Sequence, residues 1–137
     1  MVTDYVLGFA RDDLYRIALI EKLKPEWQKG LHNGIGGKVE AGEYISQAMS
    51  REFFEETGVH IPAEGWTWRG IMYGPNWTVQ IFTAFSHEVR GIRSTTPEKV
   101  GLFTPWNLPK CVSNVPGLLK LLFEAQDSPT ITISYDK

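Results

Sequence analysis

Residues 37–59 read GKVEAGEYISQAMSREFFEETGV, and the fold is inferred outward from this stretch. From Glu43 to Thr57 most residues are good helix formers, which predicts a helix over this range. Gly58 follows directly and is suited to end the helix in a left-handed backbone conformation. The stretch therefore predicts one well-defined helix near the middle of the sequence.

Three glutamates of this helix continue its apolar side. Because an α-helix turns by about 100° per residue, Glu52, Glu55 and Glu56 lie along one stripe. The same stripe holds the apolar residues Ile45, Ala48, Met49 and Phe53. Clustered carboxylates repel one another, and their oxygens are ligands that Mg²⁺ or Mn²⁺ prefers. The pattern indicates a divalent-cation site, and the alternative is an ordinary glutamate-rich surface helix.

Glycines just before the helix point to a bound phosphate. Gly34, Gly36 and Gly37 give a backbone that can approach a ligand closely and offer it amide or carbonyl groups. A metal site beside a phosphate-binding loop favours cleavage of a phosphate ester or phosphoanhydride.

The same stretch resembles the Nudix box, G-x5-E-x7-R-E-U-x-E-E-x-G-U with U apolar. Residues 37–59 match it at every specified position, from Gly37 to Val59. One local departure is Ile35, which stands where many members of the family have proline. The resemblance implies an α+β fold, a Nudix-type α/β/α sandwich with a mixed central sheet, formed by residues 1–137 as a single domain.

The resemblance also implies roles for individual residues. The expected Mg²⁺ ligands, with Mn²⁺ as a possible substitute, are Glu52, Glu55, Glu56 and the carbonyl of Gly37. Arg51 and Glu43 are expected to orient this cluster. Arg51 and Glu55 could instead form a simple ion pair four residues apart, and a carboxylate at Glu43 would favour the helix N-terminus without any catalytic duty.

The implied reaction is hydrolysis of a nucleoside diphosphate linked to another group. The leading hypothesis is a nucleoside triphosphate diphosphatase that yields a nucleoside monophosphate and pyrophosphate, with 8-oxo-dGTP as a candidate substrate. The first alternative is an ADP-ribose or nucleotide-sugar pyrophosphatase, because Pro75 stands near where such members often have a proline. An alternative of another class is a nucleotide-sensing Nudix module that does not cleave its ligand.

Residues outside the box complete the predicted site. Glu98 stands where many members of the family have a loop glutamate, and the resemblance implies that it binds metal or activates water, with Glu88 as its competitor and a solvated loop residue as the alternative. Lys38 could contact a substrate phosphate. Asn33 and Asn114 are candidate base readers, because an amide offers both a donor and an acceptor.

Each candidate base reader has a structural alternative. Asn33 precedes a glycine and could form a turn, and Asn114 could cap the second helix. Aromatic residues could stack on the base, although core packing is an equally ordinary role for them. The candidates are Trp27, Trp77 and Phe82.

The rest of the sequence predicts strands grouped around two separated helices. The strands are expected at Tyr5–Phe9, Arg16–Lys22, Ile35–Glu40, Trp66–Tyr73, Trp77–Phe85, Val100–Thr104 and Thr130–Tyr135. Pro25–Gly34 is predicted to be a loop and Val115–Gln126 a second helix. The missing alternation of strand and helix favours an α+β fold over a doubly wound sheet.

Composition excludes several other functions. With 14 Lys+Arg against 16 Asp+Glu, the net charge is -2, which disfavours a nucleic-acid polymer as partner. No signal peptide or membrane span is recognised, and the single cysteine, Cys111, cannot form an internal disulfide, so we expect a soluble protein in the reducing cytoplasm. The expected partner is a small nucleotide, and the sequence leaves monomer and homodimer open.

Overall fold

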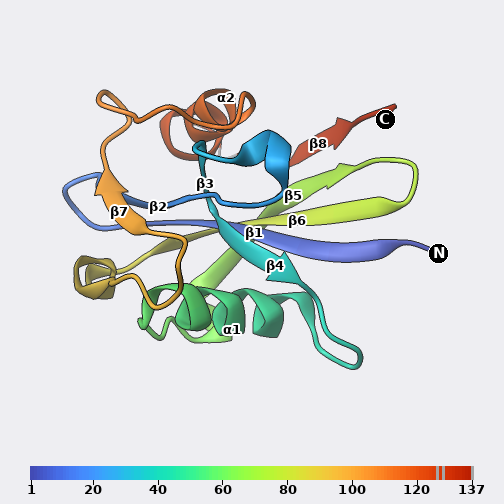
Figure 1. Cartoon of the computed structure of the whole chain (residues 1–137), viewed down its shortest axis with the longest axis horizontal. Helices are drawn as coiled ribbons and strands as arrows, with labels where there is room; N and C mark the ends of the chain where they lie inside the picture. The colour runs from blue at the N-terminus through green and yellow to red at the C-terminus, as the bar shows by residue number, and fades with distance from the viewer. Residues whose placement is uncertain (126, 128, 137) are drawn as a thin grey trace.

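The computed structural model describes residues 1–125, 127 and 129–136 (Figure 1). The strands are β1 (Thr3–Arg11), β2 (Ile17–Glu21), β3 (His32–Asn33), β4 (Ile35–Lys38), β5 (Trp66–Tyr73), β6 (Trp77–Phe85), β7 (Val100–Phe103) and β8 (Ile131–Ser134). The helices are α1 (Ile45–Thr57), α2 (Val115–Leu119), the 3₁₀ turns η1 (Glu26–Gln28), η2 (Ala63–Gly65) and η3 (His87–Gly91), and the π-helical turn η4 (Lys120–Glu124).

The strands form one mixed sheet with β1 near its centre. In the described residues the strand order is β3-β2-β1-β6-β5-β8, with β4 paired to β1 and β7 paired to β2. β1 runs parallel to β6 and β8 runs parallel to β5, whereas the remaining pairs are antiparallel. β4 pairs with the first half of β1, from Tyr5 opposite Lys38 to Gly8 opposite Ile35. This pairing places the glycine-rich segment at the middle of the sheet.

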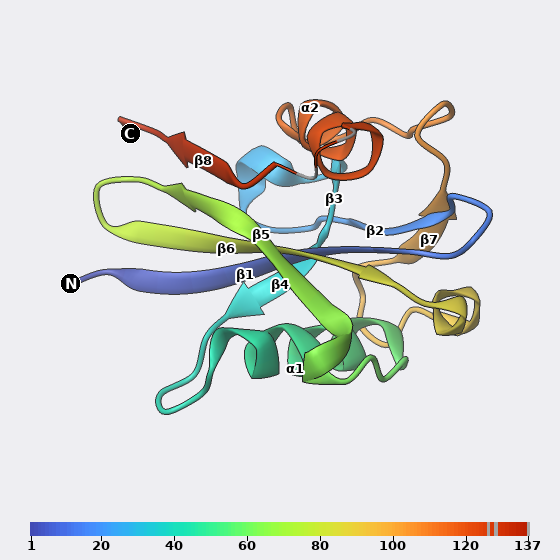
Figure 2. The same ribbon diagram turned by 180° about the vertical axis from the view of Figure 1, so that it is seen from behind.

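The sheet has a helix on each face, as Figures 1 and 2 show from opposite sides. The reason lies in the alternation of β1, whose neighbouring side chains point to opposite faces. Val6 and Ala10 are buried in the core under α1, whereas Leu7 and Phe9 are buried in the core under α2 and η4. A strand that is apolar on both faces needs cover on both, which gives the α/β/α layering.

The predicted α+β fold with a mixed central sheet is confirmed. The strands predicted at Trp66–Tyr73 and Trp77–Phe85 have these bounds in the structure and form the antiparallel β5–β6 hairpin. Gly58 ends α1 with φ of 73°, and its N–H donates to the carbonyl of Phe54. The prediction of a loop over Pro25–Gly34 is wrong in part. This segment contains η1 and β3, because His32 and Asn33 pair with the end of β2.

The second helix also differs from its prediction. α2 ends at Leu119 and continues as the π-helical turn η4 to Glu124, so the regular α-helix is shorter than predicted. The predicted last residue, Gln126, lies outside the described residues. No helix in the described ranges combines the length and apolar character that crossing a bilayer requires.

A buried aspartate holds the turn between β1 and β2. The Oδ1 atom of Asp12 accepts hydrogen bonds from the N–H groups of Leu14 and Arg16, both at 2.9 Å, and Oδ2 accepts from Arg16 Nε at 2.7 Å. Burial by itself would raise the pKa of Asp12, but the hydrogen bonds from Arg16 and Leu14 outweigh burial and lower it. The ionised carboxylate therefore stabilises this turn.

Replacing Asp12 with asparagine is expected to lower the free energy of unfolding by about 2 kcal/mol at pH 7, because a buried charge partner is lost. Since the pKa of Asp12 is lowered on folding, its stabilising contribution is present above the ordinary value of 3.8 and is lost as the pH falls through the folded-state value. Urea unfolding at pH 7 and at acidic pH measures both effects.

The control is Asp13→Asn, which removes an exposed carboxylate that pairs with Arg90 and His87. A surface pair of this kind contributes less than about 1 kcal/mol. Equal losses of stability in the two variants at pH 7 would contradict the role assigned to Asp12.

Candidate active site

The segment leading into α1 is closed by its own side chains. Glu43 Oε1 accepts the N–H of Glu40 at 3.0 Å, and Gln47 Oε1 accepts the N–H of Tyr44, the N-cap residue, at 3.0 Å. The N–H groups of Glu40 and Tyr44, which have no hydrogen-bond partner within the helix, thus each gain one. The result is that the Glu43 carboxylate is fixed at the start of the helix.

Arg51 connects the acidic residues of this region. Its Nε and Nη2 atoms donate to the Glu43 carboxylate at 2.8 and 3.0 Å, and Nη1 donates to Glu52 at 2.9 Å and to Glu55 at 3.2 Å. Nη2 also donates to the carbonyl of Lys38 at 2.9 Å. Arg51 is therefore more than a partner of Glu55: it joins α1 to the β4–α1 segment.

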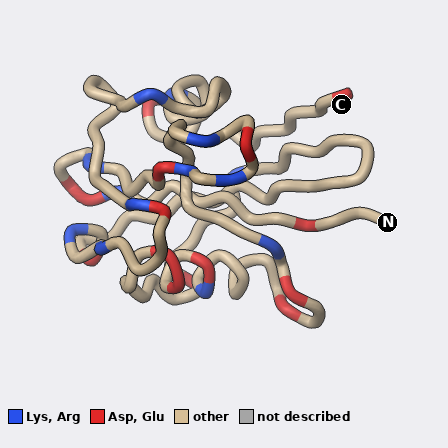
Figure 3. Tube along the Cα trace, in the orientation of Figure 1, with Lys and Arg blue, Asp and Glu red and all other residues tan. Residues whose placement is uncertain are grey.

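The charges around Arg51 shift its titration and that of its partners. Hydrogen bonding to Glu43, and then to Glu52, raises the pKa of Arg51 above its ordinary value. The hydrogen bond from Arg51 lowers the pKa of Glu43, so this carboxylate is ionised at neutral pH. Figure 3 shows the acidic residues of α1 and the segment before it, with basic residues among them.

Glu52 lies against the glycine-rich backbone. A Cβ added at Gly37 would overlap the Glu52 carboxylate, so glycine here lets this side chain keep its present position against the backbone. The Glu52 side chain is 13% exposed. Burial raises its pKa, Arg51 opposes the shift, and Glu55 and Glu56 add to it.

Glu56 lies on the same side of α1, next to the loop before β7. Its Oε2 atom accepts a hydrogen bond from Thr96 Oγ1 at 3.2 Å. Burial raises the pKa of Glu56, the Thr96 bond opposes this, and the negative charges of Glu98 and Glu55 raise it further. Burial is thus the main cause of the raised pKa values of Glu52 and Glu56, and the neighbouring acidic side chains add to it.

Glu98 binds the loop after β2. Its carboxylate accepts from Lys22 Nζ at 3.2 Å and from the N–H groups of Leu23 at 2.7 Å and Lys24 at 3.4 Å. Burial alone would raise the pKa of Glu98, but these hydrogen bonds outweigh it and lower the pKa. Of the two predicted competitors, Glu98 is the one whose charge acts on Glu56; Glu88 is exposed on η3.

The donor set fits a hydrated divalent cation. Within the described part of the chain, no three acidic, histidine or cysteine side chains converge tightly enough to form a metal site by themselves. Mg²⁺ does not require such a site, because it keeps several waters and is usually held by one or two carboxylates together with substrate phosphates. The Glu52 carboxylate lies close to the backbone at Gly37, so this part of the site offers carboxylate oxygens beside the glycine-rich segment.

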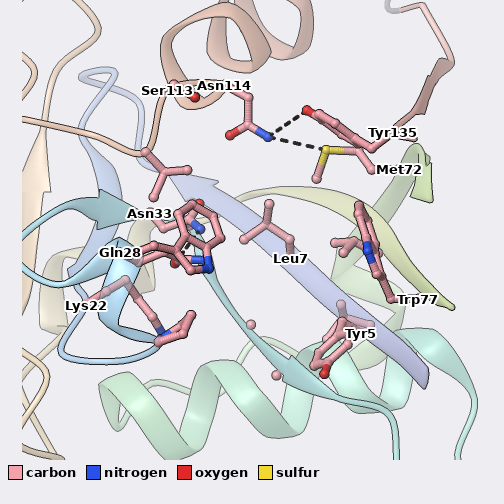
Figure 4. A pocket seen from close by; sticks show the side chains of 18 residues that line it. Tyr5, Leu7, Lys22, Gln28, Asn33, Met72, Trp77, Ser113, Asn114 and Tyr135 are labelled. Carbon is pink, nitrogen blue, oxygen red and sulfur yellow. Dashed lines mark hydrogen bonds between the residues drawn. The ribbon is translucent and has the colours of Figure 1, made fainter. Parts of the chain in front are cut away.

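A cavity of about 700 Å³ opens on the other side of the glycine-rich segment, between η1, β5 and the start of α2 (Figure 4). Asn33, Asn114, Gly36 and Gly37 all contribute to its lining, so both predicted base readers face one space. Gly37 belongs to this cavity and also contacts Glu52. The cavity and the carboxylates therefore meet at the backbone of β4.

The turn predicted as the alternative for Asn33 is not found, and the capping role predicted as the alternative for Asn114 is met by its position but not by its side chain. Asn33 lies in β3 rather than in a turn; its Oδ1 accepts the N–H of Gly34 at 2.8 Å, and its Nδ2 contacts Gln28 Oε1 at 3.5 Å. Asn114 is the N-cap residue of α2, and its carbonyl accepts the N–H of Leu118 at 3.0 Å, but its side chain makes no capping hydrogen bond. Both side chains are thus placed for roles other than turn formation or capping.

The other residues predicted to contact the substrate lie in different places. Trp27 and Trp77 line the cavity, whereas Phe82 is buried in the core under α1. Lys38 is exposed and does not belong to the cavity lining; its carbonyl accepts from Arg51. A phosphate contact by the Lys38 side chain stays a prediction.

Several cavity residues were missed by the sequence analysis. They are Tyr5, Lys22, Gln28, Met72, Ser113 and Tyr135. Gln28 and Tyr135 come from a short turn and from the end of the chain, and no spacing in the sequence connects them with the Nudix box. The strand alternation around Met72 could have identified it as inward-facing, but not as a cavity residue.

Comparison with known proteins identifies the domain type and the fold. A family model of the NUDIX domain matches residues 3–112. The MutT protein of Bacillus halodurans is 21% identical with a TM-score of 0.76, covering 98% of this chain and 91% of that chain. A NUDIX hydrolase of Nitrosomonas europaea is 15% identical with a TM-score of 0.73, covering 99% and 80%.

A third similar structure is the MutT NUDIX hydrolase of Burkholderia pseudomallei, 22% identical with a TM-score of 0.71, covering 86% of this chain and 95% of that chain. No curated protein matches the sequence. At these identities the structural likeness shows the shared fold.

Proposed function

The chain belongs to the NUDIX domain family, and from this premise we propose that it hydrolyses nucleoside triphosphates to nucleoside monophosphates and pyrophosphate, with oxidised purine nucleotides such as 8-oxo-dGTP among its substrates. Membership of the family makes the chain a hydrolase that acts on nucleoside diphosphates linked to another group. The finer assignment is supported by the cavity and by the asparagines that line it.

The observation that carries the proposal is the position of Gly37 between the two halves of the site. On one side its backbone touches the Glu52 carboxylate, and on the other it lines a cavity with a largely apolar and aromatic wall. A nucleotide needs such an arrangement, with a space for the base and a charged region for the phosphates. The glycine-rich backbone of β4 is then where the two parts of the ligand meet.

Nudix hydrolases generally need a divalent cation, and we propose Mg²⁺, with Mn²⁺ as a substitute, for this chain. The residues that would hold it are Glu52, Glu55, Glu56 and the carbonyl of Gly37. When bound, the cation neutralises phosphate charge and polarises the phosphate oxygens. Burial is the main cause of the raised pKa values of Glu52 and Glu56, and a bound cation would offset the repulsion from neighbouring acids that adds to it.

The remaining residues position this cluster. Arg51 holds Glu43, Glu52 and Glu55 in one network, which limits the orientations open to the two glutamates on α1. Glu98 fixes the segment after β2 and with it Lys22, which lines the cavity. We propose that Glu98 also contributes to water activation or metal binding, since its charge acts on Glu56.

The proposal extends to the organisation of the chain. We propose that residues 1–137 form one domain that binds a small nucleotide and neither a nucleic-acid polymer nor a membrane, as monomer or homodimer. Support for one domain comes from α2 and β8, which contribute to the same core as β1 and β2.

An assay with Mg²⁺ over a panel of substrates tests the function. The panel contains nucleoside triphosphates, 8-oxo-dGTP, ADP-ribose, nucleotide sugars and dinucleoside polyphosphates. The readout is chromatographic identification of the products, which are a nucleoside monophosphate and pyrophosphate from a triphosphate and two organic phosphates from ADP-ribose or a nucleotide sugar. We expect pyrophosphate from triphosphates and the highest kcat/KM in this group. Preferential cleavage of ADP-ribose or nucleotide sugars would overturn the substrate assignment, and binding without cleavage would indicate a sensor.

The position of Pro75 supports a nucleoside triphosphate rather than ADP-ribose as the substrate. Pro75, the residue that raised this alternative, lies in the turn between β5 and β6 and is not one of the described residues that line the cavity. A hairpin turn accounts for it.

A further inference from the structure

The amide of Asn114 is held by two residues from distant parts of the chain. Its Nδ2 atom donates to Tyr135 Oη at 3.3 Å and lies 3.6 Å from Met72 Sδ. Met72 lies on β5 and Tyr135 follows β8, and all three residues line the cavity (Figure 4). The parallel pairing of β5 and β8 brings these side chains together.

These two contacts determine which end of the amide is available. A thioether sulfur carries no proton and only accepts hydrogen bonds, so the nitrogen of Asn114, and not its oxygen, faces Met72. An amide nitrogen has two N–H donors, and Tyr135 and Met72 use both of them. The oxygen points away from both partners in Figure 4.

We propose that Tyr135 is a positioning residue that, together with Met72, makes Asn114 present only its carbonyl oxygen to a ligand, so that the cavity favours bases with an N–H donor at this place. The inference rests on the proposed function in one respect, that a nucleotide base occupies the cavity. It adds a rule for which bases bind. An acceptor at this position favours a base with an N–H group, because a base without one leaves the Asn114 oxygen without a hydrogen bond.

Tyr135 is itself held in place, as a positioning residue must be. Its N–H donates to the carbonyl of Tyr73 at 2.8 Å, which continues the β5–β8 pairing. Its ring lies 5.8 Å from the ring of Trp77, at 37° between the planes. The strand and the aromatic contact together fix where the hydroxyl lies, independently of Asn114.

Binding of nucleoside monophosphates tests the proposal by titration calorimetry. AMP and GMP carry N–H donors on the base, whereas purine riboside 5′-monophosphate carries none. We expect the wild-type protein to bind AMP or GMP, whichever binds better, at least about tenfold more tightly than purine riboside 5′-monophosphate, a difference that one hydrogen bond can produce. In Tyr135→Phe, which keeps the ring on Trp77, this ratio should fall below about threefold because the amide is free to turn.

Two further variants separate positioning from general damage. Tyr73→Phe removes the hydroxyl of an exposed tyrosine that is not part of the cavity lining, and it should keep the wild-type ratio. Asn114→Asp keeps an acceptor without any N–H and should also keep the preference for donor-bearing bases. In hydrolysis assays with the preferred triphosphate, Tyr135→Phe should raise KM and leave kcat unchanged, with a melting temperature close to that of the wild type.

The outcomes distinguish this inference from the proposed function. A wild-type binding ratio near one, an unchanged ratio in Tyr135→Phe, or a preference lost in Asn114→Asp would each overturn the inference. Monophosphate binding does not depend on which phosphoanhydride is cleaved, so a failure to hydrolyse triphosphates would overturn the proposed function alone.

Discussion

Replacing Glu56 with glutamine is expected to lower kcat at least about 100-fold, equivalent to about 2.7 kcal/mol of lost transition-state stabilisation. Glutamine keeps the size of the side chain and an oxygen that can accept the hydrogen bond from Thr96, but it removes a ligand charge. Burial and the neighbouring acids Glu98 and Glu55 raise the pKa of Glu56, so a neutral side chain is tolerated in the metal-free fold. Steady-state kinetics on the best substrate measures the loss.

Melting temperatures with and without Mg²⁺, and a control variant, test whether the loss of activity arises at the metal site. The variant should keep its melting temperature without metal but show a smaller rise on addition of millimolar Mg²⁺, because ligand binding to the folded state stabilises it. Glu88→Gln, at an exposed glutamate on η3, should behave like the wild type in both measurements. Unchanged turnover in Glu56→Gln would remove Glu56 from the mechanism.

Replacing Gly37 with alanine is expected to lower kcat by about 100-fold, the loss that a displacement of about 1 Å in a catalytic group can cause. The added Cβ would overlap the Glu52 carboxylate, so either this side chain or the β4 backbone must move. Both belong to the region where the cavity meets the carboxylates. The Mg²⁺-dependent rise in melting temperature should also decrease, because the displaced Glu52 carboxylate is one of the proposed Mg²⁺ ligands.

Gly117→Ala is the matched control for this substitution. Gly117 lies in α2, and a Cβ there meets no atom within 4 Å. Alanine also has a higher helix propensity than glycine, so stability should stay the same or rise by up to about 1 kcal/mol. Full activity in Gly37→Ala would show that the close approach to Glu52 is not required.

Local signals in the sequence were sufficient for α1 and for the hairpin. Helix formers followed by Gly58 predict a helix and its end without reference to any other part of the chain, and the structure shows the left-handed residue at this position. The β5–β6 hairpin is likewise encoded by two neighbouring strands and the turn between them. In both cases the partners lie close together in the sequence.

The Nudix box also identified the family from sequence, because its glutamates and glycines have a fixed spacing within 23 residues. The pairing of Arg51 with Glu55 follows from helix geometry, since side chains four positions apart lie next to each other on a helix. The contact with the Lys38 carbonyl does not follow from it, because it depends on how the β4–α1 segment returns to the helix.

Only the tertiary structure decided the contacts between distant segments. β3 is a strand because it pairs with β2, and Glu98 binds the N–H of Leu23 across 75 residues, a contact that no local pattern predicts. The position of Asn114 beside Tyr135 results from the parallel pairing of β5 and β8. The sequence by itself thus determined the helix, the hairpin and the family, whereas chain topology determined which residues face the cavity, because strand pairing joins segments that have no sequence relation.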